Sequence, residues 1–112
     1  MDINCAIEGD VAILSLGGRM DGTQAGAVEE RFNALVQEGR SRFVFDLSEL
    51  GYISSAGLRI VLVAVKKTKA LQGRIVFAGL SEQVTEIFEM SGFLPLLETA
   101  ATRTDALQAR RG

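Results

Sequence analysis

Two adjacent serines, Ser54 and Ser55, stand between a turn and a long apolar segment. A serine becomes a nucleophile only beside a base, and the hydrolase pattern G-x-S-x-G needs a glycine where Ile53 stands. The chain contains no histidine that could serve as this base. A serine at a helix start more simply caps the helix, because its hydroxyl accepts a hydrogen bond from a free backbone N–H. We therefore predict that these serines are N-caps. A second hypothesis is that one of them accepts a phosphate, which the positive helix end would stabilise.

Two aspartates, Asp21 and Asp46, are the other candidates for chemistry. Aspartate in a turn commonly accepts a hydrogen bond from the backbone just downstream, and this is the role we predict for both. The absence of histidine excludes histidine-ligated zinc, and neither GxxxxGK[ST] nor GxGxxG occurs in the chain. We therefore expect no catalytic residue, no cofactor and no metal site, and we do not expect an enzyme.

The composition bounds the domain count and the partners. The chain has 112 residues, 47% hydrophobic and 23% charged, which suits one globular domain over residues 1–112. A net charge of -2 leaves no basic surplus for neutralising phosphates, so direct binding to nucleic acid is not expected. The longest aliphatic run, residues 60–65, is far shorter than the roughly 20 residues of a membrane span. Membrane insertion is therefore not expected.

The amino terminus and the single cysteine indicate the compartment. The first ten residues lack a basic stretch followed by an apolar one, so they do not resemble a secretory signal. Cys5 is the single cysteine of the sequence, so no internal disulfide can form. A fold without disulfides is what a reducing compartment requires. We expect a cytoplasmic protein in which Cys5 is a small core residue of the first strand.

Hydrophobic periodicity predicts the elements that must position these side chains. The first half of the chain begins with two short strand-like segments separated by a turn, followed by an amphipathic helix. In chain order we expect strands at 3–7 and 11–16, an end of the second strand at Gly17–Gly18, a helix from about Thr23 to Gly39, a buried strand at 43–47 and a turn from Ser48 to Tyr52.

In the second half of the chain, the composition of residues 60–65 (IVLVAV) is compatible with a strand, because four of the six residues are β-branched. Leu58, Val61 and Val65 lie at helical spacing, however, so we predict a helix over residues 55–71. After it we expect a strand at 74–78, a helix capped by Ser81 and ended by Ser91–Gly92, a short edge strand at 94–97 around Pro95, and a last helix from Thr102 to about Arg110. This alternation implies an α/β layer architecture.

The segment FDLSELGYISSAGLRIVL, residues 45–62, resembles the signature of STAS domains, and specifically of bacterial anti-sigma factor antagonists. The family pattern is a strand ending in D-L-S and then D-S-S/T-G-L at the opening of a helix. Two more segments are similar to the family: GRMD at 18–21 to G-E-L/I-D, and IFEMSGF at 87–93 to L-F-D-M-S-G-L. The three segments follow the family's order. The resemblance implies a single STAS domain with a mixed, mostly parallel sheet and about four helices.

The resemblance also implies a function. Such a protein binds an anti-sigma factor that is also a serine kinase, and so releases the sigma factor. The kinase phosphorylates the antagonist to break the complex, and a PP2C-type phosphatase restores it. The family's phosphoacceptor position falls on Ser55, the motif's aspartate on Ser54, and its second hydroxyl residue on Ala56. Arg59 stands where the family often has glycine. The docking residues implied in this chain are Gly18, Asp21, Gly22, Thr23, Ser54, Ala56, Gly57, Leu58 and Arg59.

Two other functions stay open at this stage. Some STAS domains are never phosphorylated, so the chain could be a constitutive subunit of a lipid ABC transporter. It could also be a STAS module that senses a small ligand. The neighbouring genes distinguish these functions, since a partner-switching pathway would place a kinase-like anti-sigma factor and a phosphatase beside this gene.

Overall fold

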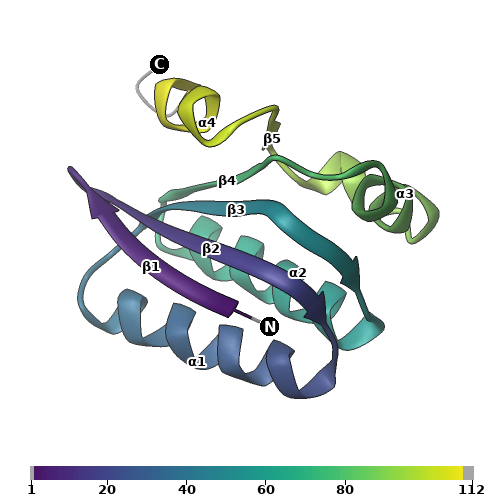
Figure 1. Cartoon of the computed structure of the whole chain (residues 1–112). Coiled ribbons are helices and arrows are strands. Elements are labelled where there is room, and N and C mark those ends of the chain that lie inside the picture. Colours follow the sequence, from purple (N-terminus) through teal and green to yellow (C-terminus); the bar gives the residue numbers. More distant parts are fainter. Residues whose placement is uncertain (1, 110–112) are drawn as a thin grey trace.

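The expected alternation of strands and helices is present in the computed structural model, which describes residues 2–109. Four α-helices, one short 3-10 helix and five strands follow one another along the chain (Figure 1). Their bounds are β1 Asp2–Glu8, β2 Val11–Met20, α1 Gly22–Gln37, β3 Arg42–Ile53, α2 Ser55–Ala70, β4 Arg74–Ala78, α3 Glu82–Met90, η1 Leu94–Leu96, β5 Thr99–Ala100 and α4 Arg103–Ala109.

The strands form one mixed sheet in the order β1-β2-β3-β4-β5. Only β1 runs antiparallel to its neighbour, and the other three pairings are parallel. Parallel neighbours need a crossover, and helices supply it: α1 joins β2 to β3 and α2 joins β3 to β4. The carboxyl ends of β2 and β3, and the amino ends of α1 and α2, therefore meet at one edge of the sheet.

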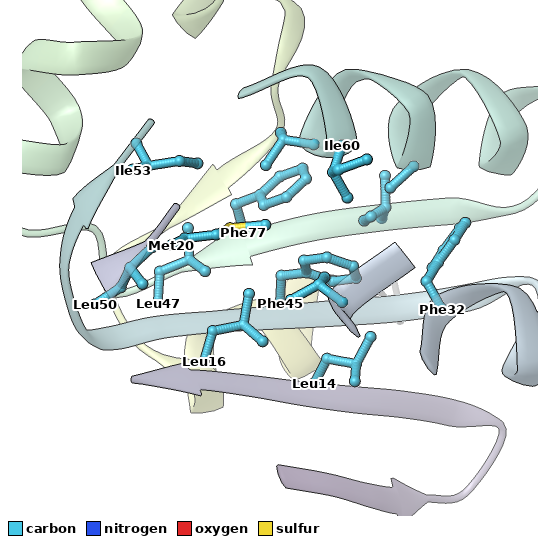
Figure 2. Close-up of a cluster of buried hydrophobic side chains, with 14 of the residues drawn as sticks. Leu14, Leu16, Met20, Phe32, Phe45, Leu47, Leu50, Ile53, Ile60 and Phe77 are labelled. Atoms are coloured by element: carbon cyan, nitrogen blue, oxygen red, sulfur yellow. The ribbon is translucent and has the colours of Figure 1, made fainter. Parts of the chain in front are cut away.

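The main core lies between the sheet and the parallel pair α1 and α2, which cover one face together (Figure 1). Alternate residues of β2, β3 and β4 face these helices. There the ring of Phe45 makes edge-to-face contacts with Phe32 and Phe77, at centroid distances of 6.0 Å and 5.3 Å. Figure 2 shows labelled side chains from three strands gathered in this layer with Phe32 of α1 and Ile60 of α2. This layer fixes where both helices begin.

The opposite face of the sheet carries a smaller core. Val11, Ile13, Val44 and Val76 pack there under α4, whose Ala106 is fully buried. The FVFDL strand is thus covered on both faces, as its near-continuous apolar run predicts. We call this face of the sheet, which lies opposite α1 and α2, the open face.

Two predicted strand ends are wrong, and bulges in β3 explain the second of them. The second strand does not end at Gly17–Gly18 but continues to Met20, and residues 48–52 are not a turn but part of β3. In the pairing of β2 with β3, β3 contributes an extra residue between Asp46 and Glu49 and another between Leu50 and Tyr52. Such bulges break the two-residue alternation that marks a strand, so the sequence pattern resembles a turn.

Two further predictions are wrong at the edges of the fold. Residues 94–96 form a 3-10 helix rather than an edge strand, and the edge strand is Thr99–Ala100. Cys5 lies in β1 but is exposed rather than in the core, because β1 is an outer strand of the sheet, and no residue of β1 is fully buried. The helix at 55–70, the strand at 74–78 and the caps at Ser81 and Thr102 are confirmed. Arg110 lies outside the described residues.

Among residues 2–109, no helix has both the length and the apolar character needed to cross a bilayer.

Candidate functional site

The structure brings Asp21 and Ser54, two residues predicted to bind the backbone just downstream, together at one edge of the sheet. Ser54 N–H donates to the Met20 carbonyl at 2.9 Å, which ties the end of β3 to the end of β2. The residue after each of these two strands caps the next helix. Asp21 follows β2 and caps α1 by accepting from Thr23 N–H at 3.2 Å. Ser54 follows β3 and caps α2 by accepting from Gly57 N–H at 3.2 Å. The cap prediction for Ser54 and the predicted turn-type bond of Asp21 are confirmed, but the cap prediction for Ser55 is wrong, because Ser55 is already the first residue of α2. We call residues 18–23 and 54–59 together the carboxyl edge.

Ser55 is the first residue of α2, and it is exposed. With Ser54 acting as the cap, the Ser55 hydroxyl has no capping role. The amino ends of α1 and α2 both lie at this edge, and their free N–H groups and aligned dipoles favour an anion there. An anionic group on Ser55 would therefore be tolerated by the fold.

The predicted docking residues differ in their accessibility. Gly18, Asp21, Gly22, Thr23 and Arg59 are exposed, and Ser54 and Ala56 are half-buried. Leu58 is buried among the side chains of the main core. Gly57 is also buried, and a Cβ built on it would lie 2.6 Å from Ile53 Cγ1. The absence of a side chain at Gly57 is thus explained by packing within this chain rather than by an approaching partner.

Asp46 belongs to a neighbouring polar network on the open face. Its carboxylate accepts from Ser48 N–H at 3.0 Å, which confirms the predicted turn-type bond. Its other oxygen accepts from Arg103 Nε at 3.0 Å, and the same guanidinium donates to Ser15. Burial acts to raise the pKa of Asp46, but the hydrogen bonds from Ser48 and the charge of Arg103 together hold it below its ordinary value. A cavity of about 290 Å³ lies beside this network.

Sequence reasoning missed two pairs at the site. Arg103 and Asp46 are far apart in the chain, and only the position of α4 over the sheet brings them together. Arg19 and Tyr52 are cross-strand neighbours, and Arg19 Cζ lies 4.3 Å from the centroid of the Tyr52 ring. The parallel order of the strands is the signal that could identify this second pair, but the sequence pattern predicts a turn at Tyr52 instead of a strand. Within residues 2–109 there is no group of three or more Cys, Asp or Glu side chains placed to hold a metal ion.

Comparison with known proteins adds independent observations. A family model described as the STAS domain matches residues 2–106. BtrV of Bordetella bronchiseptica, whose name assigns it as an anti-sigma factor antagonist, is 41% identical over 97 residues, which cover 87% of this chain and 84% of BtrV.

Solved structures match the fold. The Thermotoga maritima protein tm1081, likewise assigned as an anti-sigma factor antagonist, superimposes with a TM-score of 0.92 at 18% identity, covering 98% of this chain and 95% of tm1081. The Bacillus protein SpoIIAA in its phosphorylated form gives a TM-score of 0.77 at 18% identity, covering 96% of this chain and 98% of SpoIIAA.

Proposed function

Because this chain belongs to the STAS domain family, we propose that it is a phosphorylation-controlled anti-sigma factor antagonist with Ser55 as the phosphoacceptor. Anti-sigma factor antagonists are regulatory proteins rather than enzymes, and they interact with anti-sigma factors. In the proposed cycle, the unphosphorylated carboxyl edge binds an anti-sigma factor that is also a serine kinase. Phosphorylation of Ser55 releases this partner, and a PP2C-type phosphatase reverses the modification.

The observation that carries this proposal is the exposed hydroxyl of Ser55 at the first position of α2, beside the loop of Asp21. A kinase can reach a side chain there without unfolding any element. The adjacent Ser54 is half-buried and its oxygen already accepts from Gly57 N–H, so it is the poorer acceptor of a phosphate. That SpoIIAA has been solved in a phosphorylated form supports a phosphate being compatible with this fold.

A phosphate on Ser55 would act mainly on the partner. It carries about -1.5 to -2 charges. One pair of unit charges about 7 Å apart is worth roughly 0.6 kcal/mol in water and 2.4 kcal/mol at an effective dielectric of 20. Repulsion of one carboxylate on the partner would therefore total on the order of 1 to 5 kcal/mol. The helix start stabilises the same phosphate by about 0.3 to 2 kcal/mol, so the complex weakens while the fold persists.

Phosphopeptide mapping tests the site. The protein is incubated with ATP and the kinase-like anti-sigma factor encoded beside its gene, and the labelled peptide is sequenced. We expect phosphate on Ser55, no labelling of Ser55→Ala, and continued labelling of Ser54→Ala. Phosphate found only on Ser54, or full labelling of Ser55→Ala, would overturn the assignment of Ser55, and a wild type that is not labelled at all would favour a constitutive STAS subunit.

A further inference from the structure

Arg19 and Tyr52 form a stacked pair at the carboxyl ends of β2 and β3. Their neighbours Met20 and Ile53 point into the main core, so by strand alternation Arg19 and Tyr52 point to the open face. Arg19 Cζ lies 4.3 Å from the Tyr52 ring centroid, and both side chains are exposed, with 36% of Tyr52 accessible. The pair therefore exposes to solvent the Arg19 cation together with the Tyr52 ring over which it lies.

The charge of the Arg19 guanidinium is not compensated by any carboxylate within residues 2–109, since Arg19 forms no ion pair there. Most other arginines that the structure describes do pair with carboxylates: Arg40 with Glu38, Arg42 with Asp10, Arg74 with Glu98, and Arg103 with Asp46. The guanidinium of Arg19 lies over the ring of Tyr52, and none of its N–H donors is hydrogen-bonded to another residue within 2–109.

Stacking also prepares Arg19 for binding. Ordering a long side chain at an interface costs about 0.5 to 1.5 kcal/mol, and a side chain already held on a ring loses less freedom. The in-plane N–H groups of a guanidinium match the two oxygens of a carboxylate, and arginine and tyrosine are the residue types that most often dominate interfaces.

The position of the pair connects it to the proposed docking residues. Arg19 is next to Gly18 in β2 and lies two residues before Asp21. Tyr52 lies two residues before Ser54. We propose that Arg19, held by Tyr52, binds a carboxylate of the anti-sigma factor and thereby helps to select the partner. This inference rests on the proposed function. Arg19 and Ser55 are both residues of the carboxyl edge, so both lie where we propose that the anti-sigma factor docks.

Calorimetric titration of the unphosphorylated protein with the neighbouring anti-sigma factor tests the proposal. We expect Arg19→Glu to weaken binding at least thirtyfold, Arg19→Lys about threefold to tenfold, and Tyr52→Leu about tenfold. Arg31→Glu is the matched control, because Arg31 is exposed on α1, away from the carboxyl edge, and also forms no ion pair within residues 2–109. It should bind within about twofold of the wild type. Unchanged thermal midpoints confirm that each variant is folded.

A charge swap identifies the carboxylate. Exposed Asp and Glu residues of the anti-sigma factor are replaced singly by Lys and titrated against Arg19→Glu, and one replacement should restore at least tenfold in affinity. If the wild type binds and Arg19→Glu binds equally well, the inference fails while the proposed function stands. If the wild type does not bind at all, the proposed function itself fails. A loss for Arg31→Glu equal to that for Arg19→Glu would also overturn the inference, since it would mean that only net charge matters.

Discussion

At the residue scale, Gly57 sets how closely α2 can approach the end of β2. A Cβ at this position would lie 2.6 Å from Ile53 Cγ1 and 3.1 Å from both Met20 Cγ and the Met20 carbonyl oxygen. That carbonyl is the one that accepts from Ser54 N–H. A side chain on Gly57 would therefore separate the two loops of the carboxyl edge. This explains a glycine in the first turn of a helix, where it costs about 1 kcal/mol relative to alanine.

We expect Gly57→Val to lower the free energy of unfolding by about 3 kcal/mol, because buried overpacking forces the backbone or the core side chains to move. Gly26→Ala is the control, since a Cβ there meets nothing within 4 Å and the position is exposed in α1. It should stabilise the protein by up to about 1 kcal/mol. Urea unfolding of both variants measures this. A Gly57→Val protein of wild-type stability that no longer binds its partner would instead show that the glycine faces the partner.

The two serines are expected to differ in their contribution to stability. Ser54→Ala removes the oxygen that accepts from Gly57 N–H and should cost about 1 kcal/mol of unfolding free energy. Ser55→Ala removes an exposed hydroxyl without a capping role and should change stability by less than about 0.5 kcal/mol. Chemical denaturation of the two variants compares them directly. Equal losses would contradict the division of roles between cap and phosphoacceptor.

At the element scale, the sequence predicts those segments in which one periodicity persists. The helix at 55–70 is identified despite its β-branched residues, because Leu58, Val61 and Val65 recur at helical spacing, and all three are buried. Strand β5 has only two residues, too few for any period to show. The end of β3 is hidden by its two bulges, and this is why the Arg19–Tyr52 pair could not be predicted. The cap at Ser54 could be predicted because capping depends on local sequence, but the local sequence does not distinguish Ser54 from Ser55, and only Ser54 is a cap.

Helix α4 has too few residues to hold itself by local bonds, and the Arg103–Asp46 pair attaches it to β3. We expect Asp46→Asn to cost about 0.5 to 1 kcal/mol near neutral pH, since the Arg103 side chain is 41% exposed and solvent screens the pair. The lowered pKa of Asp46 means that the folded state favours its carboxylate. This stabilisation is complete above the unfolded-state pKa of about 3.9 and is lost as the pH falls through the lower folded-state pKa.

The measurement is urea unfolding between pH 3 and pH 7. The stability difference between the wild type and Asp46→Asn should be constant from about pH 7 to pH 5 and shrink below about pH 4. Glu38→Gln is the control, because Glu38 forms only a distant pair with Arg40, at 4.0 Å, and is 60% exposed. It should follow the wild type at every pH. A difference for Asp46→Asn that grows on acidification would show that the carboxylate is destabilising in the fold.

At the scale of the whole molecule, the main core and the proposed docking residues are located in different places. The main core lies between the sheet and the helices α1 and α2, whereas the exposed docking residues lie at the end of this layer, where both helices begin (Figure 1). The two regions share only buried residues such as Gly57 and Leu58. A charge added to an exposed residue of the carboxyl edge can therefore change binding without disturbing the core.

We expect Ser55→Asp to weaken binding to the anti-sigma factor at least fivefold, because roughly one added negative charge opposes the partner's carboxylate by on the order of 1 kcal/mol or more. Its thermal midpoint should stay within about 3 °C of the wild type, since a negative charge at a helix start is tolerated or favoured. Ser55→Asn, of nearly equal size but neutral, is the matched control and should bind within about threefold of the wild type. Titration and scanning calorimetry are run on the same samples. Equal losses for the two variants would mean that size rather than charge breaks the complex, and a midpoint that falls by more than 10 °C would mean that Ser55 is chiefly structural.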